Sequence, residues 1–412
     1  MSRTWSAIVV ATVGGFILAV LALQDLRTPN AVTWEPVDHG GLSLERAPGL
    51  VVQEAKDGVL WANDGFSIYR SEGDRGFLKV HAVKPHLSLA WLAYSRTLRK
   101  LFGVEEAIEV FPLDRERLLV FAGGEIQRVN LQSGKTETVH RLRYYGRGEG
   151  RGVMPFGITR DAEGRIYYGE YVTRRLEEGE TVALFRSDDD GESFQIVYEF
   201  PAIVVRHIHA VQWDPYGQVL WMGTGDGDEQ SRVGYSRDFG KTFLWVGQDS
   251  QDFRTVNFVF ADDHVAWLSD TIEVPSRAVR WHRDNWEIEV SPDRLPGHGH
   301  YLQSVGNGFH VATTAEEIAS LWLVGPGLDL HMIAEWPLAD ARMAGFGTVR
   351  LARGQLGQDD RIYFSPLRVQ QERPSIYRLT RRMAFAAAGV RPLAEGRLFS
   401  GDDPSQAANF RP

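Results

Sequence analysis

The chain has 412 residues, 43% of them hydrophobic and 11% aromatic, and a formal net charge of −9 at pH 7. This length suits a large core or a repeat fold, and the acidic balance without dense Lys or Arg runs argues against a nucleic-acid partner. Because there is no cysteine, disulfides, thiolate metal sites and cysteine nucleophiles are excluded.

The N-terminal segment, residues 1–23, predicts a membrane anchor. Arg3 is followed by an uncharged apolar run from Trp5 to Leu23, and about 20 apolar residues are enough to cross a bilayer. The positive charge before the run favours an N-terminus on the cytoplasmic side, so we expect the remainder to be periplasmic or extracellular. A signal peptide cleaved after Ala22 is the alternative, and it predicts a secreted protein.

Residues 24–47 predict a linker, since they contain prolines and a Gly-Gly pair. Residues 48–383 contain repeated groups of four short strands rich in Val, Ile and aromatic residues, separated by turn residues. Such units favour an all-β fold, namely a β-propeller. We count seven four-stranded blades, and six or eight are also compatible with the pattern.

The seventh group of strands lacks a clear fourth member. Residues 31–37 or 42–44 are candidates to supply it, which would close the ring and remove its edges. A stretch rich in Leu, Lys and Arg, residues 86–104, is an insert with helical character. Residues 384–412 predict a loose C-terminal tail.

Two eight-residue segments share the pattern Ser-x-Asp-x-Gly-x-x-Phe. Their defining residues are Ser187, Asp189, Gly191 and Phe194 in the first copy, and Ser236, Asp238, Gly240 and Phe243 in the second. Ser and Asp side chains bond the backbone of tight turns, and Gly tolerates the positive φ that such turns need. Residues 71–77 carry a weaker copy. The pattern therefore predicts hairpins at equivalent positions of the repeated units.

These segments resemble the Asp-box, or BNR, repeat of sialidase-like β-propellers. The resemblance implies a structural role for the hairpins at the propeller rim and a glycosyl-hydrolase-like, exported bacterial protein. It does not extend to sialidase chemistry, because the Phe-Arg-Ile-Pro motif of sialidases is missing and the chain has only Phe253-Arg254-Thr255-Val256. We therefore do not expect a sialidase proper.

Acidic and histidine side chains recur at strand ends that a propeller brings to one face. The candidate catalytic residues are Glu170, Tyr171, His207, His209, Asp226, Asp270 and His300. His207 and His209 alternate on a strand and so point to one side, and histidine suits acid–base work because it titrates near neutral pH. Polar side chains that only solvate the loops are the alternative explanation.

A second set of residues predicts contacts to an acidic sugar. Its members are Arg147, Arg151, Arg206, Asp228, His298 and Tyr301. Arginine pairs well with carboxylates, and two of these arginines lie in the glycine-rich segment 144–152. A solvated connecting loop with a few charges is the alternative for that segment.

Two reaction classes fit these candidates. Glycoside hydrolysis commonly needs two carboxylates, and Glu170 together with Asp226 and Asp228 could supply such a pair. A lyase acting on uronic acids needs a Tyr or His base and a cation on the sugar carboxylate, a combination that Tyr171, His209 and Arg206 provide. His-x-His pairs can also hold a metal, but the sequence marks no carboxylate partner for them, so we predict neither a metal nor another cofactor.

The sequence thus predicts an exported, carbohydrate-active β-propeller, a glycosidase or lyase acting on an acidic polysaccharide or glycan. A non-catalytic propeller that binds glycan or assembles an envelope complex is the alternative. The predicted partners are a carbohydrate and, through the N-terminal helix, a membrane, whereas the oligomeric state is not predicted.

Overall fold

The computed structural model describes residues 29–83 except 73, and residues 108–390 except 147, 202, 272–274, 340–345, 355–359 and 371–372. The predictions for the N-terminal anchor, for the 86–104 insert, for Arg147 and for the tail beyond residue 390 lie outside these residues. No helix within the described ranges is long and apolar enough to span a membrane.

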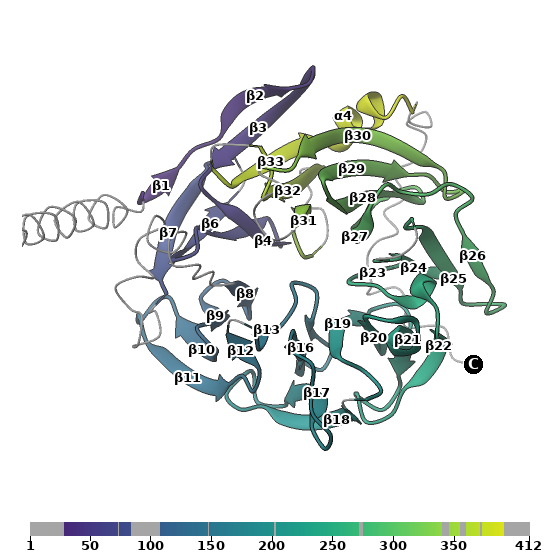
Figure 1. Cartoon of the computed structure of the whole chain (residues 1–412). Helices are drawn as coiled ribbons and strands as arrows, with labels where there is room; N and C mark the ends of the chain where they lie inside the picture. The colour runs from purple at the N-terminus through teal and green to yellow at the C-terminus, as the bar shows by residue number, and fades with distance from the viewer. Residues whose placement is uncertain are drawn as a thin grey trace, which may run out of the picture.

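Antiparallel sheets stand around a central axis, with their strands ordered from the axis to the rim (Figure 1). The first two of five such sheets contain β4–β7 (Val51–Lys56, Val59–Asn63, Ser67–Glu72, Phe77–Ala82) and β8–β11 (Glu109–Pro112, Arg117–Ala122, Glu125–Asn130, Thr136–Arg141). The third contains β14, β15, β17 and β18 (Ile158–Arg160, Ile166–Gly169, Thr181–Ser187, Gln195–Pro201). The fourth and fifth contain β19–β22 (His207–Asp214, Val219–Gly225, Arg232–Ser236, Leu244–Gln248) and β23–β26 (Phe258–Phe260, His264–Leu268, Ala278–His282, Ile288–Val290). This arrangement is a β-propeller fold.

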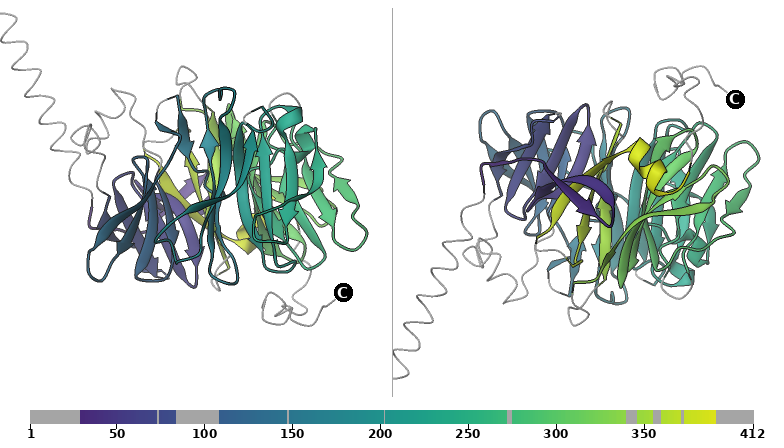
Figure 2. Two further views of the ribbon diagram at one scale, coloured as in Figure 1. Left: turned by 90° about the horizontal axis from the view of Figure 1, so that it is seen from below. Right: turned by 90° about the horizontal axis from the view of Figure 1, so that it is seen from above.

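A nine-stranded sheet completes the ring. It contains β27–β30 (His298–Gly306, Phe309–Glu316, Ile318–Val324, Leu330–Pro337), β31–β33 (Gly347–Leu351, Arg361–Leu367, Ser375–Thr380), β3 (Leu42–Pro48) and β2 (Glu35–His39). Its two halves are joined where β28 pairs with β31. Seen from the side in Figure 2, the strand ends form the two faces of the ring.

The second strand of several sheets forms because apolar residues cover both of its faces. β5, β20 and β24 are buried at every position, as expected for strands enclosed between neighbouring sheets. Trp61, Trp221 and Trp267 lie on these three strands and are almost inaccessible to solvent. Large aromatic side chains at one strand position therefore fill the gaps between successive sheets.

The prediction of a linker at residues 24–47 is corrected by the structure. This range holds β1 (Ala31–Val32), which pairs with β7, then β2 and most of β3. Gly40 and Gly41, with φ of 61° and 86°, make the turn between β2 and β3. The glycines that suggested a flexible segment thus form a hairpin turn, which the composition alone does not distinguish from a linker.

β3 pairs antiparallel with β33, so the N-terminal part of the chain supplies the strand that the last group lacks. Glu45 accepts hydrogen bonds from Arg378 at 2.8 and 3.0 Å across this junction. Of the two candidate segments, residues 42–44 thus begin the pairing strand. Without β3, β33 would be left as an open edge.

The predicted loose tail begins too early. Helix α4 (Arg381–Ala387) packs against β30 and β33, and it buries Ala384 and Phe385. Phe385 contacts Phe309 at a ring distance of 4.8 Å. The first residues of that range are therefore part of the core, because they place an apolar helix face on the outermost strands.

The two Ser-x-Asp-x-Gly-x-x-Phe segments form hairpins with the same hydrogen bonds, one between β17 and β18 and one between β21 and β22. In the first, Ser187 Oγ donates to Asp189 at 2.7 Å and accepts from the Gly191 amide at 2.8 Å. In the second, Ser236 Oγ donates to Asp238 and accepts from the Gly240 amide, both at 2.8 Å. Each hairpin thus bonds its own turn at the rim of the ring.

Candidate functional site

Two His-x-His strands enter the centre of the ring at the starts of β19 and β27 (Figure 1). In β19 the ladder register shifts across His209, and in β27 it shifts across His300 and Tyr301. Such bulges redirect side chains and are common beside functional sites. The second histidine of each pair therefore leaves the regular alternation of its strand.

A three-stranded sheet lies beside the first histidine pair. It contains β12 (Tyr145–Gly146), β13 (Gly150–Gly152) and β16 (Tyr171–Val172). The Tyr171 ring stacks on His207 at 4.1 Å. A Cβ at Gly150 would lie 2.5 Å from the Tyr171 carbonyl oxygen, so glycine is needed for this close approach. The glycine-rich segment is thus a hairpin that supports the tyrosine.

His207 lies between two oxygen atoms and is 2% exposed. Its Nδ1 is 2.6 Å from the Val172 carbonyl oxygen, and its Nε2 is 3.0 Å from Asp226 Oδ1. Arg206 Nη1 donates to the other oxygen of Asp226 at 2.7 Å. The ring and the carboxylate therefore hold each other in position.

His209 is 1% exposed and stacks on His207 at 4.6 Å. Its Nδ1 has no hydrogen-bond partner among the described residues. A Cβ at Gly225 would lie 2.6 Å from His209 Cε1 and 3.0 Å from Arg254 Cγ. Glycine at the end of β20 is thus required for the histidine and the arginine to approach the backbone.

Arg254 joins the two halves of the site. Its Nη2 lies 3.3 Å from Asp226 Oδ1 and 3.3 Å from Asp270 Oδ2. His298 Nδ1 and His300 Nε2 each lie 3.7 Å from the other oxygen of Asp270. One buried cation therefore links two carboxylates, and each carboxylate faces one histidine pair.

The two carboxylates have opposite electrostatic environments. Burial acts to raise the pKa of Asp226, but the hydrogen bond from His207 and the nearby charges of His209 and Arg254 outweigh it, so the pKa lies below its ordinary value. Burial raises the pKa of Asp270 to about 6, against the opposing charge of Arg254. At neutral pH Asp226 is ionised, whereas Asp270 lies closer to its pKa and a minor fraction of it is protonated. Such pairs mark acid and base assignments in active sites.

The buried aromatic and imidazole groups favour their neutral forms. Burial, followed by the charges of His207 and Arg254, holds the pKa of His209 well below its ordinary value. Burial, with the charge of His298, lowers the pKa of His300 to about 3. Burial also raises the pKa of the Tyr171 hydroxyl. His209 and His300 are therefore neutral at neutral pH, and the tyrosine retains its proton.

The structure brings together six of the seven predicted catalytic residues, and Glu170 is the exception. Arg143 Nε and Nη2 donate to its two carboxylate oxygens at 2.7 and 2.5 Å, and the Ala183 amide donates at 2.9 Å. The side chain is almost fully buried in these contacts. Glu170 thus holds β15, β17 and the segment before β12 together.

The predicted sugar contacts fall in different places. Arg206 binds Asp226, while His298 and Tyr301 lie in the cluster around Asp270. Arg151 is exposed on β13, and its charge acts on Tyr171 and His300. Asp228 is exposed in the short 3-10 helix Asp228–Gln230 and has no assigned partner in the cluster.

Two members of the site were missed in the sequence. Arg254 follows the 3-10 helix Gln251–Phe253 and drew attention only as part of an incomplete sialidase motif. Phe346 contacts His298 and His300 at ring distances of 5.5 and 5.6 Å and remains 42% exposed. An exposed aromatic residue before a strand is a weak signal, so only its position beside the histidines identifies it.

A second charged cluster lies on, or directly after, the inner strands of three neighbouring sheets. Arg350 on β31 donates to both oxygens of Glu109 on β8, and Arg353 donates to Glu109 at 3.0 Å and to Glu54 at 3.4 Å. All four side chains are buried. Because every charge has a partner, this cluster is a structural clamp across the closure of the ring.

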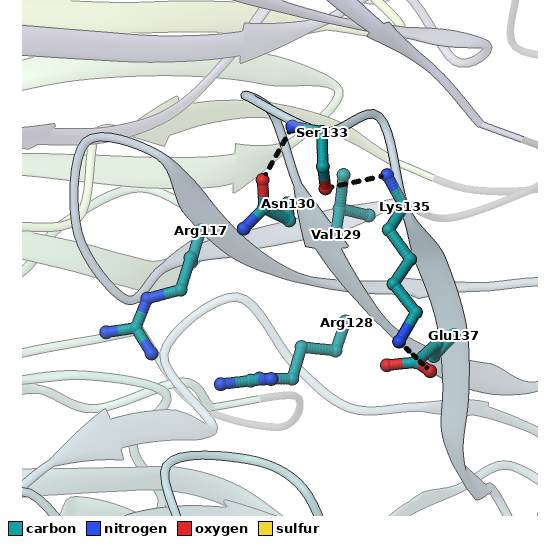
Figure 3. A pocket seen from close by; sticks show the side chains of 7 residues that line it. All are labelled: Arg117, Arg128, Val129, Asn130, Ser133, Lys135 and Glu137. Atoms are coloured by element: carbon teal, nitrogen blue, oxygen red, sulfur yellow. Dashed lines mark hydrogen bonds and ion pairs between the residues drawn. The ribbon is translucent and has the colours of Figure 1, made fainter.

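A pocket of about 240 Å³ lies outside the ring centre, on the sheet β8–β11. Figure 3 shows Arg117 and Arg128 beside it, with Lys135 paired to Glu137 at 2.6 Å. Both arginines also form ion pairs with Asp190. The pocket is lined by side chains that already have partners, and it lacks the histidines and buried acids of the central cluster, so we place the functional site at the centre.

No family model matches the chain, and no curated protein matches it. Among solved structures, an oligogalacturonate lyase in complex with manganese is similar with a TM-score of 0.55 and 10% identity, over 86% of this chain and 98% of that one. An oligogalacturonate lyase from Vibrio parahaemolyticus is similar with a TM-score of 0.53 and 9% identity, over 84% and 96%. At these identities the likeness concerns the fold, which is a β-propeller.

Proposed function

We propose that the protein cleaves an acidic glycan by β-elimination at a uronate residue. The observation that carries this proposal is the link through Arg254 between Asp226 and Asp270, each beside a histidine pair. Proton-accepting, proton-donating and cationic groups thus lie in one cluster at the ring centre. The fold shared with two proteins named as oligogalacturonate lyases supports the same class of substrate.

The residues of the cluster suit the steps of an elimination. A base removes the proton on C5 of the uronate, the C4–O bond breaks as the C4=C5 double bond forms, and an acid protonates the leaving oxygen. We assign the base to His300, which lies beside Asp270, and the acid to Tyr171, which stacks on His207 in the same cluster. Arg151 is exposed and its charge reaches both, so we assign it to the sugar carboxylate.

Hydrolysis of the same class of glycan is the second candidate, and one observation favours it. The raised pKa of Asp270 and the lowered pKa of Asp226 fit a general acid and an ionised partner. Both candidates remain within the carbohydrate-active class, and they differ in their products.

The test is incubation with a panel of acidic and neutral polysaccharides, following new reducing ends and the absorbance of unsaturated uronate. Both signals together support elimination, and reducing ends without absorbance support hydrolysis. We expect His300→Ala and Arg151→Met to lose activity, and Asp228→Asn, at an exposed position outside the cluster, to retain it. If the protein is retained on a glycan column but forms no product, the result would support a glycan-binding module in place of an enzyme.

We also propose that residues 1–23 anchor the protein to a membrane with the propeller outside the cytoplasm. The support is the uncharged apolar run after Arg3. Protease digestion of intact cells and of spheroplasts would test this placement. Release into the medium as a chain lacking residues 1–22 would instead support a cleaved signal peptide.

We further infer seven blades, with the nine-stranded sheet counted as two, and we interpret the two rim hairpins as Asp-boxes. The support is the division of that sheet into β27–β30 and β31–β33 with β3, together with the repeated Ser and Asp hydrogen bonds. An experimental structure with another grouping of strands would overturn the count.

A further inference from the structure

We propose that His207, His209 and Asp226 bind one divalent transition-metal ion. The nitrogen and carboxylate donor atoms of these three residues lie within 4.8 Å of one another. The histidines lie at the start of β19 and Asp226 directly follows β20, and these two strands are paired. The inference goes beyond the proposed glycan reaction and does not depend on it, because it concerns binding alone.

The contacts of His207 are the first argument. Its Nδ1 faces a carbonyl oxygen at 2.6 Å, and its Nε2 faces a carboxylate oxygen at 3.0 Å. Both oxygens accept hydrogen bonds and an ionised carboxylate donates none. When this ring is neutral it carries only one proton, and one of its two nitrogens then faces an acceptor with no hydrogen between them. A cation between Nε2 and Asp226 satisfies both lone pairs, and the Nδ1–H bond to Val172 is then the usual outer contact of a metal-bound histidine.

The spacing of the donors is the second argument. Two ligands at right angles on a metal, with bonds of about 2.1 Å, lie about 3.0 Å apart, and the Nε2–Oδ1 distance is 3.0 Å. Opposite ligands lie about 4.2 Å apart on the same geometry. All donor atoms of the group lie within 4.8 Å of one another, so at most a small rotation of the rings brings them to coordination distance.

His209 supplies the third argument. It is 1% exposed, and its Nδ1 has no partner among the described residues. A buried polar nitrogen without a partner is costly, and coordination to a cation removes that cost. The close approach of Gly225 places this ring against His207 rather than against solvent.

The donor set indicates which ions bind. Two imidazoles and one carboxylate suit Mn²⁺, Co²⁺, Ni²⁺ or Zn²⁺, whereas Ca²⁺ and Mg²⁺ prefer oxygen ligands alone. Arg206 and Arg254 also contact Asp226, and their charges oppose a second positive ion. Asp226 offsets the charge of one arginine and Asp270 offsets the charge of the other. We therefore expect the protein to bind the ion with moderate rather than very high affinity.

The experiment measures binding of Mn²⁺ and Zn²⁺ to the full-length protein, prepared without a histidine tag and treated with EDTA. We expect one ion per chain, seen as loss of the free Mn²⁺ spectrum in electron paramagnetic resonance, and a rise in Tm on addition of the ion. His209→Ala and Asp226→Asn are expected to weaken binding at least 10-fold. Asp228→Asn, an exposed acid two positions from Asp226, is the matched control and should bind like the parent.

Misfolding of a variant is separated from loss of the site by its Tm in EDTA. The proposal is supported if a variant has the same Tm in EDTA as the parent but its Tm does not rise when the ion is added. Two results would overturn it: no stoichiometric binding of either ion by the parent, or parent-like binding by both His209→Ala and Asp226→Asn. Neither result bears on whether the protein cleaves a glycan, which product analysis decides separately.

Discussion

Arg350 donates to both carboxylate oxygens of Glu109 at 2.8 and 2.6 Å, and the two residues lie 241 positions apart in the chain. Arg350 is on β31 and Glu109 on β8, so the ion pair joins inner strands from distant parts of the sequence. Both side chains are buried. The pair thus helps to close the ring at its centre.

Glu109→Gln is expected to destabilise the fold by about 3–5 kcal/mol, because it leaves Arg350 buried without its counter-ion. The free energy of unfolding in urea would measure this loss. Lys135→Gln is the control: its ion pair with Glu137 is largely exposed, so its loss should cost less than about 1 kcal/mol. If the two substitutions lowered the free energy of unfolding equally, the result would contradict a structural role for the Glu109 ion pairs.

Asp189→Ala is expected to destabilise the first rim hairpin by about 1–2 kcal/mol. The substitution removes acceptors for the amides of Glu192 and Ser193 and for the Ser187 hydroxyl. Thermal unfolding measures the effect. Asp188→Ala, at the neighbouring exposed position, should change stability by less, and glycan cleavage below the Tm should be unchanged in both variants.

Asp270→Asn should change how stability depends on pH. The pKa of Asp270 rises from 3.8 to about 6 on folding, so the folded state keeps this proton longer than the unfolded state. The favourable contribution is present below pH about 4 and is lost as the pH rises through about 6, a change of about 3 kcal/mol. Asparagine does not titrate, so the variant should gain stability relative to the parent between pH 4 and pH 7.5 in urea unfolding. Parallel pH profiles would show that burial does not raise this pKa.

Gly225→Ala should displace His209 and Arg254, since the new Cβ would lie 2.6 Å from His209 Cε1. Overpacking of this kind costs about 1–3 kcal/mol of stability. We therefore expect the variant to remain folded with a lowered Tm but to lose most of its rate of glycan cleavage. Gly327→Ala is the control, because its Cβ would meet Asp329 only at 3.5 Å. Full activity in Gly225→Ala would show that the position of His209 is not required.

The convergence of the two His-x-His strands followed from local patterns. A strand alternates its side chains, and a ring of similar sheets places equivalent strand ends on one face, so His207 and His300 were expected near Asp226 and Asp270. The rim hairpins followed from Ser, Asp and Gly at fixed spacing. These inferences succeed because each depends on neighbours within a few residues of the chain.

Other features depend on partners distant in sequence. Glu170 has the local pattern of a catalytic residue, but Arg143 binds both of its carboxylate oxygens. Arg254 drew no functional interpretation, yet it contacts both central carboxylates. The predicted linker contains most of β3, which pairs with β33 near the C-terminus. Strand propensity alone does not identify such a partner.

The sequence by itself determined the all-β repeat character, the rim turns and the presence of two histidine pairs, because strand alternation and turn chemistry act over a few residues. Only the tertiary structure decided which charges meet, which become buried and which strand closes the ring. The physical reason is that Coulomb interactions and desolvation depend on distance and burial in space, so Asp226 and Asp270, which both follow second strands of their sheets, have different partners and opposite pKa shifts.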